Sequence, residues 1–306
     1  MATRSIETTR APSAATLRLA KVRSYVALTK PRIIELLLIT TLPTMFVARR
    51  GVPSVTLMLA TLVGGTLAAG GANATNMVID RDIDKVMRRT RNRPLVTGEV
   101  TARAALTFAI AIEIVAFVEL WLTVNLLSAC LAVAATAFYV FVYTMWLKRS
   151  SSSNIVIGGA AGAVPVLVGW AAVTGTLSWA PVVLFAIIFV WTPPHFWALA
   201  IRYRDDYEAA EVPMLPVVAT FAKTARQILL YTALLVGLTV LFGFVGHMGA
   251  LYFAVAIVLG ASFLAYSVRL LKRLDAVTAL RMFKYSISYL SLLFLVMAVD
   301  VVVRHP

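Results

Sequence analysis

The sequence contains little cysteine and little charge for its length. Its 306 residues include one cysteine, Cys130, which lies inside an apolar run, and only 14% of the residues are charged. A single cysteine excludes a disulfide framework, a thiolate metal cluster and a paired-cysteine redox centre. Soluble domains carry about 25% charged residues, whereas this chain is 60% hydrophobic and has a mean hydropathy of +0.87. The composition therefore excludes a water-soluble globular protein.

Long apolar runs make up most of the chain. A transmembrane helix needs about 20 apolar residues, whereas the strands of a membrane β-barrel alternate over roughly 10 residues. The sequence therefore predicts an all-α integral membrane protein with nine transmembrane helices, in a single domain over residues 25–303. The predicted spans are residues 33–48, 54–78, 104–124, 126–146, 155–175, 179–200, 228–246, 249–270 and 283–303.

The basic residues are distributed unevenly between the two sides of this predicted bundle. Of 28 Lys and Arg residues, all but Arg49, Arg50 and Arg304 fall on the side that carries the N-terminus. The positive-inside rule then predicts a cytoplasmic N-terminus and an outer C-terminus. Residues 1–24 contain five basic residues and no apolar core, so we interpret them as a disordered cytosolic tail and not a secretory signal. A mitochondrial transit peptide is the alternative.

A polar cluster follows the second span. Asn76, Asp80, Asp84 and Arg88 recur every four residues and would form one stripe if the helix continues. Two carboxylates one turn apart, beside an amide, suit Mg²⁺, which typically also takes waters and phosphate oxygens. The basic residues just beyond would bind the remaining phosphate charge. Asp82 falls on the opposite face, where we expect solvent or a salt bridge. The alternative is a charge run that only anchors the helix.

A second cluster follows the sixth span, four helices later. It begins with Pro193, Pro194 and His195 and continues with Arg202, Arg204, Asp205, Asp206, Glu208 and Glu211. The equivalent placement predicts two four-helix pseudo-repeats plus one further helix. Facing acidic ends would repel each other unless cations bridge them, so both clusters are expected to line one cytosolic cavity. An ordinary charged loop is the alternative. The prolines are expected to break or kink the helix, which leaves His195 either facing the cavity or buried and hydrogen-bonded.

Isolated residues in the spans favour structural interpretations. Glu113 and Asp300 lie within predicted spans, where we expect neutral or paired carboxyl groups with structural roles. Several glycines of the fifth span allow close helix packing; they are Gly158, Gly159, Gly162 and Gly169. The aromatic residues Tyr139, Tyr143, Phe196 and Trp197 could stabilise a carbocation, although packing is the more common role of membrane aromatics.

The spaced Asn76, Asp80 and Asp84, followed by the segment 90–95, resemble the first aspartate-rich motif of the UbiA-type intramembrane prenyltransferases. Further stretches resemble one branch of that family, the heme O synthases. They are residues 28–32, 154–163, 169–170, 194–200, 205–207 and 213–216. The resemblance covers roughly residues 24–303. His195 and Arg202 stand where the wider family aligns carboxylates, which puts a complete second metal site in doubt, and Glu211 stands where a glycine is expected.

The resemblance implies transfer of a farnesyl group from farnesyl diphosphate to a vinyl group of heme B, with Mg²⁺ as cofactor. It implies that Asn76, Asp80 and Asp84 are the catalytic, metal-binding residues. The implied substrate-binding residues are Arg88, Arg93, Lys148, His195, Arg202, Asp205 and Asp206. It further implies a bacterial cytoplasmic membrane, with a mitochondrial inner membrane as the alternative, and heme A synthase or oxidase assembly proteins as candidate partners, without nucleic acid.

Three other functions stay open at this point. A related prenyltransferase could act on another acceptor, such as a quinone ring precursor. A secondary transporter with an internal repeat would place its ionisable groups near the bilayer midplane, whereas the clusters here lie at the cytosolic ends of the spans. An assembly factor for a respiratory oxidase would have no need for Asp80 and Asp84 one turn apart beside Asn76.

Overall fold

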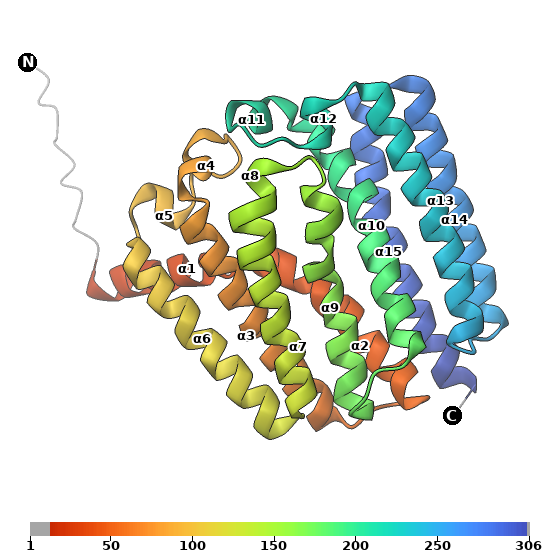
Figure 1. Ribbon diagram of the computed structural model, residues 1–306. Helices are drawn as coiled ribbons and strands as arrows, with labels where there is room; N and C mark the ends of the chain where they lie inside the picture. Colours follow the sequence, from red (N-terminus) through yellow and green to blue (C-terminus); the bar gives the residue numbers. More distant parts are fainter. Residues whose placement is uncertain (1–12, 305–306) are drawn as a thin grey trace, which may run out of the picture.

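The computed structural model describes residues 13–304, and all regular elements within that range are helical (Figure 1). Long helices run side by side through the molecule. They are α2 (Pro31–Arg49), α3 (Val55–Ile79), α6 (Ala102–Thr123), α7 (Leu126–Ala137), α9 (Asn154–Thr174), α10 (Trp179–Arg202), α13 (Phe221–Val245), α14 (Ala250–Arg273) and α15 (Ala276–Arg304). Helix α7 continues through the π-helix η1 (Phe138–Leu147) into α8 (Lys148–Ser150).

Within the described range, eight helices are long and apolar enough to cross a membrane. The apolar part of α2, Leu38–Arg49, is shorter than the others, so the count of nine spans and their orientation stay predictions. Large apolar side chains face outward along these helices; Trp121, Phe141 and Trp179 are examples. A lipid environment explains this exposure because water would make it costly. The all-α prediction is confirmed, and the protein is a multi-pass integral membrane protein.

Two groups of helices form the interior. The larger apolar core joins α10, α13, α14 and α15 and includes residues of α2 and α9, among them Val47 and Ala163. A smaller core lies where α3 packs against α6 and includes Ala74 and Ala105. The predicted repeat of four helices is not tested by this packing and stays a prediction.

Short helices connect the long ones at one end of the bundle. Helices α4 (Arg81–Val86) and α5 (Pro94–Thr97) follow α3, whereas α11 (Arg204–Ala209) and α12 (Leu215–Val218) follow α10. Figure 1 shows all four at the same end as α8. Ile83 and Met87 of the first segment share an apolar cluster with Val212 and Met214 of the second. The two charged segments identified in the sequence therefore meet at one end of the molecule.

The expected tail differs from the structure in its described part. Helix α1 (Ala14–Leu28) is capped by the Ser13 hydroxyl, which accepts a hydrogen bond from the Thr16 amide at 3.2 Å. Residues 14–24 are therefore helical where we expected disorder, because a polar N-cap followed by good helix formers starts a helix. Residues 1–12 lie outside the described part of the chain.

Of the carboxylates in the spans, Asp300 has the paired surroundings that we expected. Asp300 of α15 is buried and accepts hydrogen bonds from the Gly249 and Tyr252 amides at 2.7 and 3.2 Å, so it caps the start of α14. Glu113 of α6 lies against Gly71 of α3, where an added Cβ would come within 2.5 Å of its Oε2. Close helix contact therefore accounts for the small residue opposite Glu113.

Candidate active site

Three of the four residues in the predicted polar stripe at the end of α3 are buried. Asn76, Asp80 and Asp84 are 3%, 0% and 2% exposed. Helix α3 ends at Ile79 and α4 begins at Arg81, yet the Asp80 and Asp84 amides still donate to the carbonyls four residues earlier, at 2.9 and 2.8 Å. The helical spacing therefore survives the break, as the prediction required.

Arg88 does not belong to this stripe. Helix α4 ends at Val86, and Met87 takes an extended conformation, which turns the following residues away from the helical register. Arg88 is exposed at this position. The prediction that four residues share one face was therefore wrong at Arg88.

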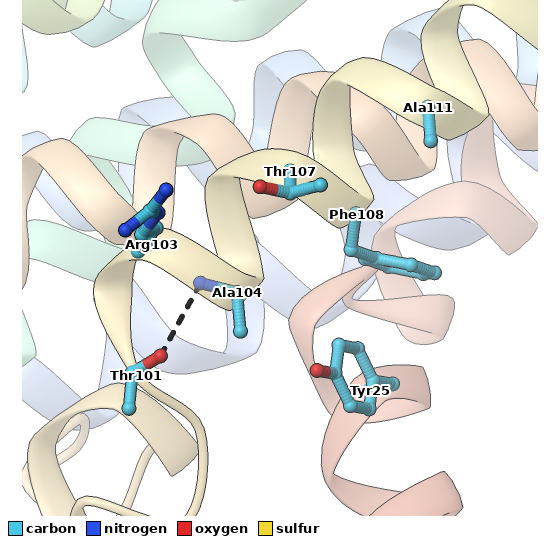
Figure 2. A pocket seen from close by; sticks show the side chains of 7 residues that line it. All are labelled: Tyr25, Thr101, Arg103, Ala104, Thr107, Phe108 and Ala111. Carbon is cyan, nitrogen blue, oxygen red and sulfur yellow. Dashed lines mark hydrogen bonds between the residues drawn. The ribbon is translucent and has the colours of Figure 1, made fainter.

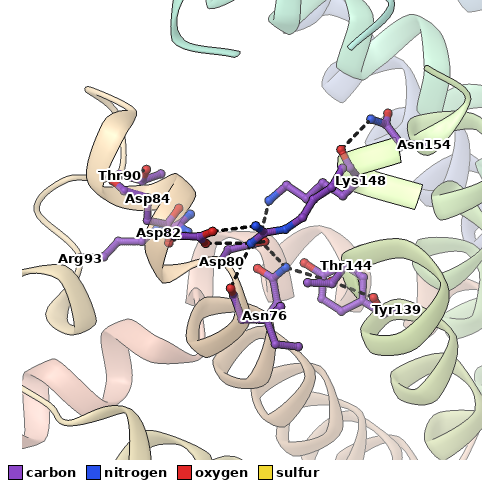
Figure 3. A network of polar contacts seen from close by, with 12 residues as sticks. Asn76, Asp80, Asp82, Asp84, Thr90, Arg93, Tyr139, Thr144, Lys148 and Asn154 are labelled. Carbon is purple, nitrogen blue, oxygen red and sulfur yellow. Dashed lines mark hydrogen bonds and ion pairs between the residues drawn. The ribbon is translucent and has the colours of Figure 1, made fainter. Parts of the chain in front are cut away.

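Two cations pair with the buried carboxylates (Figure 3). Lys148, at the start of α8, forms an ion pair with Asp80 Oδ2. Arg93, which precedes α5, pairs with Asp84 Oδ2 at 2.5 Å. Removing such charges from water is costly unless each finds a partner. The two residues expected to bind phosphate therefore lie directly beside the residues expected to bind metal.

Lys30 is a third cation of the site, and no role was predicted for it. Its Nζ donates to Asn76 Oδ1 at 2.6 Å from the link between α1 and α2. Burial, together with repulsion from Arg93 and Lys148, lowers the pKa of Lys30 to about 7. Its backbone is left-handed, with φ at 53°. The only sequence signal was its place in the segment 28–32.

The π-helix η1 forms the side of the site that faces the bundle. The Asn76 amide nitrogen donates to Asp80 Oδ2 at 2.8 Å and to the Thr144 hydroxyl at 3.0 Å. Thr144 in turn donates to the Tyr139 carbonyl five residues earlier. Such π-helical segments often occur at functional sites. The amide is thus held between α3 and η1 with its oxygen directed at Lys30.

An aromatic contact also holds this part of η1 in place. The rings of Tyr139 and Tyr143 are stacked, with centroids 5.4 Å apart. Gly158 of α9 lies under the Tyr143 ring, and an added Cβ would collide with it. Packing, as expected for the glycines of this helix, is therefore the role of Gly158.

The donor set fits a hard divalent cation. Asp80 Oδ1 is buried without a hydrogen-bond partner, and Arg149 Nη2 lies 3.9 Å from it. In the described part of the chain, no three His, Cys, Asp or Glu side chains are arranged so that they could together hold a metal ion. The protein therefore offers two carboxylates and the Asn76 amide. Mg²⁺ bound there would need waters or substrate phosphate oxygens to complete its shell.

Asp82 lies outside this site, as we expected. It is exposed and accepts two hydrogen bonds from Arg149, at 2.6 and 2.8 Å. These bonds hold the pKa of Asp82 well below its usual range. The prediction of a salt bridge on the opposite face is confirmed.

His195 is buried in the second half of the bundle. Its Nδ1 forms a hydrogen bond of 2.7 Å with the Ser286 hydroxyl, and its ring stacks on Trp191 at 4.1 Å. Helix α10 continues through Pro193 and Pro194, so the expected break does not occur. Of the two alternatives for His195, the structure matches the buried, hydrogen-bonded one.

The charged residues at and after the end of α10 are more open than the carboxylates at and after the end of α3. Arg202 and Asp205 are exposed, and Asp206 is half-buried. None of these three forms an ion pair among residues 13–304. The structure therefore places them at the same end of the bundle as the first cluster without joining them into a second acidic site.

Arg89, a member of the basic run after the second span, links the two charged segments, a contact that we did not predict. Its guanidinium lies 5.9 Å from the Tyr203 ring centroid and hydrogen-bonds to Tyr207 of α11. Burial nevertheless raises the pKa of the Tyr207 phenol. A basic run gives no indication of which arginine reaches a tyrosine more than 100 residues away.

Residues 13–304 form an all-helical membrane bundle with buried carboxylates and cations paired at one end. The comparisons are specific about its class. The model of the UbiA prenyltransferase family matches residues 37–295. The chain belongs to that family.

Curated relatives extend along nearly the whole chain. The protoheme IX farnesyltransferase of Frankia alni is 55% identical over 287 residues, which are 93% of this chain and 99% of the relative. The protoheme IX farnesyltransferase of Mycolicibacterium smegmatis is 54% identical and covers 92% of both chains. The chain is thus similar in both sequence and length to enzymes of that name.

Solved structures agree on the fold. A structure described as digeranylgeranylglyceryl phosphate synthase matches with a TM-score of 0.77 at 19% identity, covering 92% of this chain and 99% of the other. A UbiA homologue from Archaeoglobus fulgidus, bound to DMAPP and Mg²⁺, matches with a TM-score of 0.64 at 17% identity, covering 92% and 99%. At such identities the likeness concerns the fold alone.

Proposed function

We propose that this chain transfers the farnesyl group of farnesyl diphosphate to a vinyl group of heme B and so forms heme O. The observation that carries the proposal is the 55% identity, over 93% of the chain, to an enzyme named protoheme IX farnesyltransferase. The site at the ends of α3 and η1 supports it, because its charges suit a diphosphate.

Five charged side chains surround the place where the diphosphate would bind. Lys30, Arg93 and Lys148 supply three cations, and Asp80 and Asp84 supply two carboxylates. The carboxylates and the amide of Asn76 would hold Mg²⁺, as fits the unpartnered oxygen of Asp80. When bound, Mg²⁺ would stabilise the negative charge that develops on the leaving group. The cations would bind the oxygens that the metal does not reach.

The reaction needs no nucleophile from the protein. The bond between C1 of the farnesyl chain and the diphosphate oxygen breaks, and its electron pair leaves with the diphosphate. The π electrons of the heme vinyl group then form a bond to C1. Water adds to the cation left on the former vinyl group and loses a proton. Lys30, Arg93 and Lys148 contribute by holding the departing diphosphate, since charges placed before the reaction stabilise a transition state at little cost of reorganisation.

The acceptor would approach from the second half of the bundle. His195, Arg202, Asp205 and Asp206 lie in or after α10, and α11 contacts the first charged segment through Arg89. We assign these α10 and α11 residues to the heme side of the site. Arg88 remains a candidate substrate contact, because it is an exposed cation in the segment that follows α4.

The protein would work in a bacterial cytoplasmic membrane, with the site facing the cytoplasm. This orientation is supported by the concentration of Lys and Arg residues at the end of the bundle that carries α4, α5, α8 and α11. Heme A synthase and oxidase assembly proteins are the candidate partners, because they would receive the heme O that this enzyme forms.

The test is formation of heme O by the purified protein in lipid. Heme B and farnesyl diphosphate are supplied with Mg²⁺ or with EDTA, and the porphyrins are identified by mass. We expect heme O only with Mg²⁺. Farnesylation of a quinone ring precursor but not of heme would support the alternative acceptor, and solute flux without release of diphosphate would support a transporter.

A further inference from the structure

A hollow lies outside the candidate active site, between α1 and the first half of α6 (Figure 2). Its volume is about 590 Å³. Tyr25 of α1 and Phe108 of α6 form an edge-to-face pair in its wall, with ring centroids 5.1 Å apart. The complete lining consists of Tyr25, Thr101, Arg103, Ala104, Thr107, Phe108 and Ala111. We call this hollow the α1–α6 groove.

The groove changes character along α6. Thr101 and Arg103 lie at the start of the helix, whereas Phe108 and Ala111 lie further into the predicted span. At about 1.5 Å per residue, Ala111 is about 12 Å deeper along the helix axis than Arg103. A phospholipid changes from a polar headgroup to acyl chains over a similar depth. The polar and apolar ends of the groove thus match the two parts of a lipid.

The polar end carries an excess of positive charge. Arg103 is exposed and has no ion-pair partner among residues 13–304. Arg103 is the one charged residue of the lining. The nearby Glu99 is engaged, because it accepts hydrogen bonds from Ser24 at 2.6 Å and from Thr97 at 3.1 Å. The charge at this end therefore complements an anionic phosphate.

Helix α1 exposes apolar and basic side chains next to the groove. Leu19, Val22 and Val26 are 52%, 58% and 51% exposed and share one face at helical spacing. Arg18, Lys21 and Arg23 are exposed on the same helix. Figure 1 shows α1 crosswise to the long helices, beside the start of α6. The groove therefore opens where headgroups would lie.

We propose that the α1–α6 groove binds one anionic phospholipid, with its phosphate at Arg103 and Thr101 and an acyl chain against Tyr25 and Phe108. The site is separate from the diphosphate site, whose residues are on α3, α4, η1 and α8 and in the links before α2 and α5. An anionic lipid held there would join α1 to α6 and thereby support the segment that carries Lys30.

The test uses the full chain in nanodiscs that contain either photoreactive phosphatidylglycerol or photoreactive phosphatidylcholine with the same acyl chains. Crosslinked peptides are mapped by mass spectrometry. We expect phosphatidylglycerol to label residues 101–111 at least about fivefold more than phosphatidylcholine, since one basic residue near the surface contributes about that factor. Arg103→Gln should remove this preference, and Phe108→Ala should reduce labelling by both lipids.

Arg281→Gln is the matched control, because Arg281 is an exposed arginine of α15 without an ion pair in the described range. Equal labelling by both lipids, or a preference that Arg103→Gln leaves unchanged, would overturn the proposal. Loss of labelling in the presence of excess farnesyl diphosphate would also overturn it, since the groove would then belong to the substrate path. If Phe108→Ala does not give a monodisperse protein, Arg103→Gln alone decides the result.

Discussion

The charged segments after α3 and after α10 occupy equivalent places in the chain but differ in burial and in partners. After α3, Asp80 and Asp84 are almost completely buried and pair with Lys148 and Arg93. After α10, Asp205 is exposed and Asp206 is half-buried, without ion pairs among the described residues. The comparison teaches that similar composition produces a prearranged ion site only where other segments supply counter-charges.

This difference suits a reaction with two unlike substrates. A diphosphate needs fixed positive charge before its bond breaks, because fixed charges need no reorganisation during the reaction. A large planar acceptor needs access, which the more exposed second segment can provide. We therefore assign the first segment to the diphosphate and the second to the acceptor.

The largest effect is expected at the first segment. Asp80→Asn should lower the rate of farnesyl transfer on the order of 10²- to 10³-fold, as loss of a fixed electrostatic group does in other enzymes. The measurement is heme O formation by equal amounts of membrane-inserted protein. Asp82→Asn is the matched control, since Asp82 is exposed and binds Arg149 instead. Equal losses in the two variants would mean that the division into a buried and an exposed face is wrong.

A substitution of Lys30 tests whether the diphosphate site extends beyond the charged segment that follows α3. Lys30→Gln should weaken binding of an inert thio analogue of farnesyl diphosphate by about 10- to 100-fold, the range expected for loss of a hydrogen bond to a charged group. Binding is measured by calorimetry in detergent with Mg²⁺ present. Lys85→Gln is the control, because Lys85 is exposed on α4 and unpaired within the described range. Unchanged affinity in Lys30→Gln would confine the site to Asn76, Asp80, Asp84, Arg93 and Lys148.

Run length and charge suffice to predict the helices and the position of the first site. Each long apolar run in the sequence corresponds to a helix of the structure, and the spacing of Asn76, Asp80 and Asp84 survives the break at the end of α3. These features are local, because hydrophobic length and the helical repeat depend on neighbouring residues.

The remaining parts of the site depend on contacts between distant segments. Lys30 reaches Asn76 across 46 residues from a left-handed backbone position, and no local pattern indicates that approach. The π-helix that carries Thr144 has no distinctive sequence either. Burial of Asp80 compared with exposure of Asp205 likewise results from how the segments pack. Tertiary packing therefore decides which members of a charged run become functional.

A smaller effect is expected from the second segment. The double variant Asp205→Asn and Asp206→Asn should lower heme O formation by about fivefold, because exposed charges typically contribute up to about 1 kcal/mol. Affinity for the thio analogue should stay unchanged, since neither carboxylate contacts the first segment's ion pairs. A loss as large as that of Asp80→Asn, together with lost analogue binding, would identify a second metal site and remove the distinction between the segments.

The smallest effect concerns the packing that places η1 beside the first segment. Gly158→Ala should destabilise the protein by about 1–3 kcal/mol, the range for an overfilled core, because the new Cβ would collide with the Tyr143 ring. Gly162→Ala is the control in the same helix, since no atom lies within 4 Å of its added Cβ. Thermal unfolding followed by fluorescence should therefore show a lower midpoint for Gly158→Ala only. Analogue binding should weaken with it if Tyr143 holds η1 in place. Equal midpoints would mean that η1 adjusts freely, and the fixed arrangement of the first segment would then rest on its ion pairs alone.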